Sequence, residues 1–168
     1  MKDIYIRTFY TLIKERERDT GFQMTETVEH YCVYLLAERV EKKNIIPDPS
    51  FAEKYLIMYQ DPRAEEFRQF GDDCLFFTSL LPNYGARRGL SKSYFCDLGV
   101  ASYDTCGTLG GDVLYKQLSN CFYELQEFLE STIKNRPIES LFKLDFEILV
   151  TPTLLGIAII FASETIGD

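Results

Sequence analysis

Apolar side chains recur every three or four residues through most of this 168-residue chain, and that spacing is the strongest constraint on its fold. It is clearest over residues 112–134, where the stripe consists of Leu114, Leu118, Cys121, Phe122, Leu125, Phe128, Leu129 and Ile133. Such a period places the apolar residues on one face of an α-helix, and that face must be buried against other elements. The sequence therefore predicts an all-α fold.

Five further segments show helical spacing or helix boundary signals: 3–18, 25–43, 50–59, 61–81 and 91–105. Ser50 and Glu53 have the spacing of a capping box, in which each side chain satisfies a free backbone donor. Asp61 followed by Pro62 is typical of an N-cap and a first helical residue, and Ser91 is typical of an N-cap. With 112–134, these segments predict a compact bundle of about six helices.

Glycines qualify this pattern in two ways. The glycine-rich stretch 106–111 predicts a break between two helices. Gly71 and Gly99, in contrast, lie inside predicted helices. A glycine within a helix costs about 1 kcal/mol relative to alanine, so we expect that a neighbouring helix approaches closely at these two positions.

We expect a single domain over 1–168, with a C-terminal segment, 137–168, that differs in composition. Residues 142–148 alternate apolar and polar side chains, and 154–162 carry no polar side chain. This segment is predicted to be either helical or a short pair of strands. The uncharged stretch 148–163 is shorter than the roughly 20 residues that span a bilayer, so we expect no membrane span. Burial in the core or at an interface is the alternative for its apolar run.

The charge balance indicates which partners the chain is expected to avoid, and the cysteines indicate its compartment. The chain has 18 basic and 26 acidic residues, and a net charge of -8 disfavours binding to nucleic acid. Its five cysteines show no C-x-x-C spacing, which favours reduced thiols and a cytoplasmic location. Asp3 and Arg7 occupy positions where a secretion signal needs an apolar core. We expect the cysteines to be buried as small packing residues, and an exposed, reactive thiol at Cys106, beside Gly107, is the alternative.

Three stretches of sequence are considered together: Thr-Glu-Thr-Val-Glu-His-Tyr-Cys-Val-Tyr-Leu-Leu at 25–36, Phe-Gly-Asp-Asp-Cys-Leu-Phe-Phe-Thr-Ser-Leu-Leu-Pro at 70–82, and Tyr-Phe-Cys-Asp-Leu-Gly-Val-Ala-Ser-Tyr at 94–103. The set resembles a group of uncharacterised bacterial all-helical proteins over about residues 22–133. Phe70 stands where that pattern has Leu, and Leu81 where it has Phe. The resemblance implies an all-helical fold and no particular activity.

One candidate site combines acidic, aromatic and histidine side chains from several predicted helices: Glu26, His30, Asp72, Tyr94 and Tyr103. Carboxylates and histidines on facing helices form the ligand and metal sites of helical bundles. A di-iron site would need two Glu-x-x-His pairs, and this chain has one histidine, so we predict no metal centre and no cofactor. Three interpretations stay open: a solvated helix face whose acids favour the helix N-terminus, a ligand pocket with a possible enzymatic role, or a structural network in which a buried Asp72 binds tyrosine hydroxyls.

A second candidate site is the basic loop that precedes the helix at Ser91. Arg87, Arg88 and Lys92 lie there without a neighbouring acid, and the free backbone N–H groups of a helix N-terminus attract anions. The loop lacks the Gly-Lys-Ser/Thr order of a phosphate-binding Walker loop. The site is predicted to bind an anion or an acidic segment, and an ordinary solvated loop is the alternative.

The sequence identifies no catalytic residue. It contains no Gly-x-Ser-x-Gly motif, and a cysteine or serine nucleophile would have only His30 as an imidazole base. The resulting prediction is a protein-binding or adaptor module that binds a protein partner or forms a homodimer. It would act through an aromatic groove or the apolar C-terminal segment. The alternative is a ligand- or metal-binding bundle that uses the first candidate site.

Overall fold

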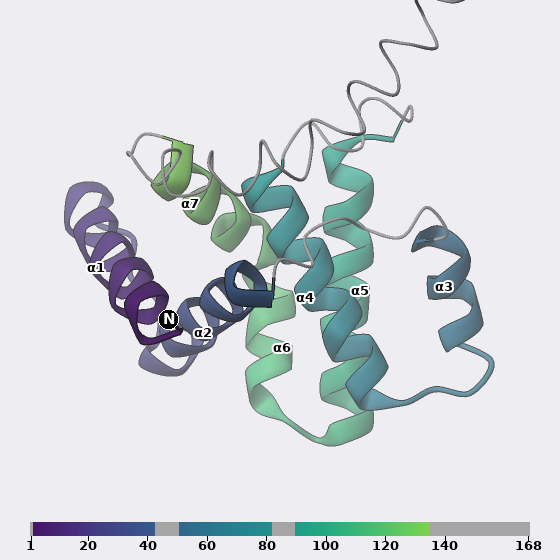
Figure 1. The fold of residues 1–168 in the computed structure, drawn as a ribbon. Helices are drawn as coiled ribbons and strands as arrows, with labels where there is room; N and C mark the ends of the chain where they lie inside the picture. Colours follow the sequence, from purple (N-terminus) through teal and green to yellow (C-terminus); the bar gives the residue numbers. More distant parts are fainter. Residues whose placement is uncertain (1, 43–50, 82–89, 135–168) are drawn as a thin grey trace, which may run out of the picture. The chain divides into compact units, whose positions relative to one another are not determined.

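The computed structural model describes residues 2–42, 51–81 and 90–134, and this part of the chain forms helices and no strand. Seven helices follow one another (Figure 1): α1 (Lys2–Thr20), α2 (Glu26–Lys42), α3 (Phe51–Met58), α4 (Ala64–Leu80), α5 (Lys92–Gly110), α6 (Val113–Asn120) and α7 (Phe122–Lys134). The predicted all-α class is confirmed. The predicted C-terminal helix or strand pair, 137–168, and the proposed cap residue Ser50 lie outside the described residues.

Residues 1–132 form one unit of the chain, and the last two residues of α7 belong to a second unit, 133–168. Within the first unit, α4 packs along α5, α5 along α6, and α1 along α2, while α2 also contacts α4 and α6. The centre of the unit is rich in aromatic residues. Its largest fully buried side chains include Phe67, Phe70, Phe76, Tyr103 and Phe122.

The close helix contacts expected at Gly71 and Gly99 are confirmed. A Cβ atom at Gly71 would lie 2.7 Å from Cδ1 of Tyr103, and one at Gly99 would lie 2.3 Å from Cζ of Phe122. Both distances are far shorter than van der Waals contact. The two glycines therefore make room for aromatic rings, Gly71 on α4 for a ring of α5 and Gly99 on α5 for the first ring of α7.

The helix predicted over 61–81 begins later than its start signals indicate. Helix α4 starts at Ala64, and its N-cap residue, Arg63, provides no side-chain cap. The predicted cap, Asp61, instead accepts a hydrogen bond from Nη2 of Arg63 at 2.7 Å. At the start of α5 the prediction is confirmed, because the Ser91 hydroxyl accepts a bond from the backbone N–H of Tyr94 at 3.1 Å.

The predicted break at 106–111 is wrong for most of its length. Helix α5 continues to Gly110, and Gly111 ends it in the left-handed conformation, with φ of 66°. The glycines serve packing: a Cβ at Gly107 would lie 2.9 Å from Cγ and 3.1 Å from the backbone nitrogen of Lys116. Helix α6 thus turns back closely against the end of α5, which a larger residue at 107 would prevent.

The single helix predicted over 112–134 is also wrong, because it divides at Cys121 into α6 and α7. Cys121 leaves the helical region, with φ of -110° and ψ of 18°, although its N–H still binds the Gln117 carbonyl. The apolar period continues through the break, and neither glycine nor proline marks it. The break coincides with the insertion of the Phe122 ring beside Gly99.

Replacing Gly99 by alanine tests this close contact. The added methyl group would overlap the Phe122 ring, so we expect the free energy of unfolding to fall by roughly 1–3 kcal/mol, as for other overpacked cores. Urea denaturation followed by circular dichroism measures the change. Gly110→Ala is the matched control, since its Cβ would lie 3.7 Å from that of Ala64 and only the helix-forming benefit of alanine applies. Equal stability of both variants would contradict the packing described above.

Candidate functional site

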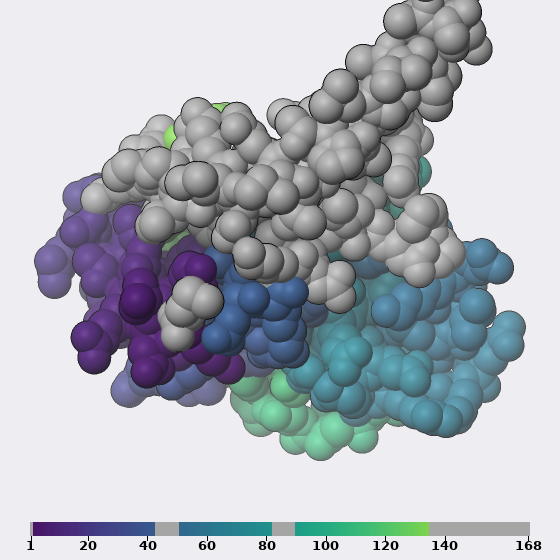
Figure 2. All heavy atoms as spheres, in the orientation of Figure 1, coloured from purple at the N-terminus to yellow at the C-terminus, as the bar shows by residue number. Residues whose placement is uncertain are grey.

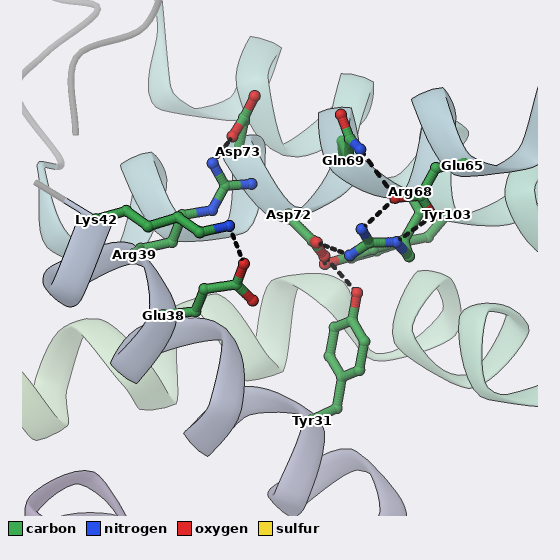
Figure 3. A network of polar contacts seen from close by, with 10 residues as sticks. All are labelled: Tyr31, Glu38, Arg39, Lys42, Glu65, Arg68, Gln69, Asp72, Asp73 and Tyr103. Atoms are coloured by element: carbon green, nitrogen blue, oxygen red, sulfur yellow. Dashed lines mark hydrogen bonds and ion pairs between the residues drawn. The ribbon is translucent and has the colours of Figure 1, made fainter. Parts of the chain in front are cut away.

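The carboxylate of Asp72 lies at a junction of three helices (Figure 3). The hydroxyl of Tyr31 on α2 donates to Oδ1 of Asp72 at 2.5 Å, and the hydroxyl of Tyr103 on α5 donates to the same atom at 2.8 Å. Nη1 of Arg68, one turn earlier on α4, donates to Oδ2 at 2.6 Å. Asp72 itself is only 2% exposed. The arrangement, which we name the Asp72 network, joins α2, α4 and α5.

Each member of the Asp72 network is placed by its helix. Arg68 and Asp72 are four residues apart on α4, the spacing at which helical side chains meet. Tyr103 reaches the carboxylate because its ring lies over Gly71, the residue before Asp72. Its ring also stacks on Tyr115 of α6 at 6.1 Å between centroids, and Tyr31 packs edge-on against Tyr115 at 5.9 Å. The three tyrosine rings thus pack against one another, and two of them reach the carboxylate.

Burial dominates the electrostatics of this site. Removal from water raises the pKa of Asp72 to about 6, although the two tyrosine hydroxyls and the Arg68 guanidinium act in the opposite direction. Burial also raises the pKa of Tyr31 and of Tyr103, and the neighbouring Asp72 charge raises both further. At neutral pH the site therefore holds an ionised carboxylate and two neutral phenols.

A second layer of charges surrounds the Asp72 network on α4 and α2. Arg68 also binds Glu65 with two of its nitrogens, at 2.7 and 2.5 Å, and this contact lowers the pKa of Glu65 to about 2. The next carboxylate, Asp73, pairs with Arg39 of α2 at 2.6 Å. Two consecutive aspartates of α4 thus hold two side chains of α2 that lie eight residues apart, Tyr31 and Arg39 (Figure 3).

The chemistry open to the Asp72 network is limited by its own hydrogen bonds. A carboxylate offers about four lone-pair positions, and three of them are occupied by Tyr31, Tyr103 and Arg68. Because Asp72 is also almost fully buried, a substrate or ion would have to displace one of these donors. Buried polar groups that are fully satisfied rigidify a core and specify one arrangement of its helices. This geometry fits a structural role.

The structure brings together two of the five residues of the first predicted site. Asp72 and Tyr103 form a direct hydrogen bond, which is the structural network that the sequence left open as an alternative. Tyr94 lies outside the Asp72 network and packs its ring edge-on against Phe95, at 5.4 Å between centroids. The side chains of Glu26 and His30 are exposed on α2, and neither is among the donors to Asp72.

The predicted anion site is described only in part. Arg87 and Arg88 lie outside the described residues. Lys92, the first residue of α5, donates to Oε2 of Glu130 on α7 at 2.8 Å. The same carboxylate oxygen accepts a bond from Gln126, whose amide nitrogen also binds the Thr78 carbonyl on α4. Lys92 therefore already has an acidic partner within this chain.

Sequence reasoning missed several members of these networks. Arg68 carries a usable signal, since its four-residue spacing from Asp72 on a predicted helix favours contact. Tyr31 has none, because its approach to Asp72 depends on how α2 crosses α4. The buried Glu29, which the sequence places only in an acidic first turn, forms an ion pair with Lys14 of α1. This pair raises the pKa of Lys14 and joins the first two helices.

The expectation that the cysteines are buried packing residues is confirmed for Cys106, and the alternative of an exposed, reactive thiol there is wrong. Cys106 is 3% exposed, and its burial raises the pKa of the thiol to about 11, so little thiolate forms at neutral pH. Cys32, Cys74 and Cys96 are buried as well, Cys121 is half-buried, and all five cysteines are free. The thiols thus serve as small packing residues.

Neither a metal cluster, nor a membrane-spanning helix, nor a related protein points to a function for the described part of this chain. Among the described residues, no three acidic, cysteine or histidine side chains converge as metal ligands. Within the same ranges, no helix has both the length and the apolar character needed to cross a bilayer.

A scan of protein-family models found no match to this chain, and neither did searches of curated proteins and of solved structures. The function is therefore inferred from the geometry alone.

The raised pKa of Asp72 predicts a pH-dependent stability. At pH values between the usual pKa of an aspartate and about 6, the folded chain holds a proton on Asp72 that the unfolded chain releases. Folding then takes up a proton, so this group stabilises the fold increasingly as the pH falls from 7 to 4. Relative to Asp72→Asn, the wild type should gain roughly 1.4 kcal/mol per pH unit within that window. Denaturant titrations of both proteins at several pH values measure the difference, and a difference independent of pH would contradict the assignment.

Proposed function

We propose that this chain is a protein-binding module without a catalytic step of its own, and that it binds through the outer side of α3. The observation that supports this proposal is the exposure of two consecutive aliphatic side chains on α3, Leu56 at 68% and Ile57 at 56%. Tyr59, in the turn that follows, is 48% exposed. We name these three residues the α3 apolar patch.

The outer side of helix α3 exposes aliphatic residues, Leu56 and Ile57, beside the charged residues Glu53 and Lys54. Its inner side is already used, because Phe51 and Met58 are buried. An amphipathic helix that served only the core would place polar residues opposite that side. Single exposed apolar residues are ordinary, but neighbouring ones on one element form a patch of the kind that marks interaction sites.

The α3 apolar patch rests on an ordered aromatic base. The ring of Phe51 stacks on Phe70 of α4 at 4.1 Å between centroids, and Tyr55 lies 5.1 Å from the same ring. The hydroxyl of Tyr59 lies 3.0 Å from that of Tyr55 and 3.4 Å from that of Thr105 on α5. A surface that is fixed before binding loses less conformational entropy when a partner docks. Atoms of residues 51–81 form part of the visible surface in Figure 2.

The first predicted site, that of Glu26, His30 and Asp72, supports binding less well than this surface does. The Asp72 network has its carboxylate occupied and buried, and the predicted ligands Glu26 and His30 are exposed on α2 outside it. The alternative of a ligand- or metal-binding bundle therefore has no converging set of groups among the described residues. The five free cysteines support a reducing compartment, and we place the module in the cytoplasm.

Site-specific photocrosslinking in the cell tests the proposal. A photoreactive amino acid at position 56 should give one discrete protein adduct, because this side chain faces the partner. The control places the same amino acid at position 113 of α6, where Val113 is equally exposed at 69%. It should give no such adduct. The proposal fails if position 56 yields no adduct, or if both positions yield the same ones.

A further inference from the structure

We propose that α3 is a displaceable cover, which detaches from α4 and α5 as one unit while the other helices of the first unit stay packed. The closed form is the one described above, and it presents the α3 apolar patch. This inference goes beyond the proposed function and does not rest on it, because it concerns the inner side of α3. It rests on the kind of contact that attaches α3 to the rest of the chain.

Aromatic rings attach α3 to α4 and α5. Phe51 stacks on Phe70 of α4 at 4.1 Å between ring centroids and lies 5.7 Å from the ring of Phe95 on α5. The ring of Tyr55 lies 5.1 Å from that of Phe70 and 6.4 Å from that of Phe67. The three rings that α3 covers, Phe67, Phe70 and Phe95, are all buried. We name them the α3 docking surface.

Polar contacts add little to this attachment. The hydroxyl of Tyr59, in the turn after α3, lies 3.4 Å from that of Thr105 on α5, which is long for a hydrogen bond between hydroxyls. Lys54 attracts the Asp73 carboxylate of α4 without forming an ion pair. Within the ranges 2–42, 51–81 and 90–134, no ion pair joins α3 to another helix. The ring contacts therefore provide most of the attachment of α3.

Helix α6 has the same length as α3 and is attached differently. Lys116 binds the carboxylate of Asp104 on α5 at 2.5 Å. The hydroxyl of Ser119 donates to the Val100 carbonyl, also on α5, at 3.0 Å. Leu118 of α6 is fully buried. An ion pair and a hydrogen bond thus join α6 to α5 in addition to apolar packing, so α6 provides an internal comparison for α3.

An eight-residue helix depends on its tertiary contacts to stay folded. Isolated helices shorter than about 12–15 residues are marginal in water. In α3 the side chains of Phe51 and Met58 are buried, and most of the others are exposed. Elements with few buried side chains open at a lower free energy than the core does. Its length and its few contacts therefore favour opening of α3 before the rest of the fold.

Opening would uncover the α3 docking surface on α4 and α5. Phe51, Tyr55 and Met58 lie at positions i, i+4 and i+7 of α3, the spacing with which an amphipathic helix occupies an apolar groove. A partner segment that took the place of α3 would therefore be a helix with aromatic or aliphatic side chains at the same spacing.

Native-state hydrogen exchange of the full chain at low urea concentrations tests the proposal. The backbone N–H groups of 55–58 bond within α3 and report on its opening. They should exchange at least about 100-fold faster than the most protected amides of α4 and α5, and urea should accelerate this exchange because opening exposes apolar surface. The corresponding amides of α6, 117–120, are the control and should exchange with those of α5. Equal exchange in α3 and α6, or exchange of 55–58 that does not respond to urea, would overturn the proposal.

Two substitutions separate the opening of α3 from global unfolding. Phe51→Ala removes the stacked ring and should raise the exchange rates of 55–58 at least about tenfold. Gly99→Ala disturbs a contact outside α3, so it should speed exchange in α4 and α5 and leave that of 55–58 unchanged. If Gly99→Ala speeds exchange of 55–58 as well, α3 opens only with the whole unit and the proposal is wrong. These results do not depend on whether position 56 captures a partner, so either proposal can fail while the other stands.

Discussion

A buried carboxylate must be satisfied by its surroundings, and in this chain the arrangement of three helices depends on that requirement. An ionised group taken out of water without partners costs several kcal/mol, and removing one partner of a buried pair is typically strongly destabilising. Asp72 meets the requirement with one donor from each of α2, α4 and α5. The positions of Tyr31, Arg68 and Tyr103 are thereby linked, and a shift of α2 or α5 relative to α4 would remove one of the two tyrosine donors of Oδ1.

The packing around Asp72 supports this junction. Gly71 lets the Tyr103 ring approach the backbone of α4, and Gly99 gives Phe122 the same access to α5. The pair formed by Arg39 and Asp73 anchors α2 to α4 at a second point. Because the polar groups of this centre bind one another, they provide a scaffold, and the features available to a partner lie on the surface. The α3 apolar patch is one such feature among the described residues, with Leu56 and Ile57 both exposed.

Much of the helical layout could be predicted from the sequence, because periodicity and caps are local signals. The apolar stripe of 112–134 and the Ser91 cap are examples. The break at Cys121 could not, since it follows from the fit of Phe122 against Gly99, a contact with a distant helix. The glycine at 107 misled for the same reason: it serves the close approach of α6 to α5 rather than a turn.

The residues of the candidate site were also predictable only where the signal is local. Arg68 could be assigned to Asp72 from their spacing on one helix, and Tyr103 was among the expected partners. Tyr31 and the exposure of Leu56 were beyond prediction, because both depend on how separate helices are placed against α4.

Proton NMR of the hydroxyl groups tests most directly whether Asp72 holds α2 and α5 to α4. Two slowly exchanging tyrosine hydroxyl resonances should be present, one removed by Tyr31→Phe and the other by Tyr103→Phe. Fast exchange of both hydroxyls with water, or resonances unchanged by these substitutions, would contradict the three-helix junction.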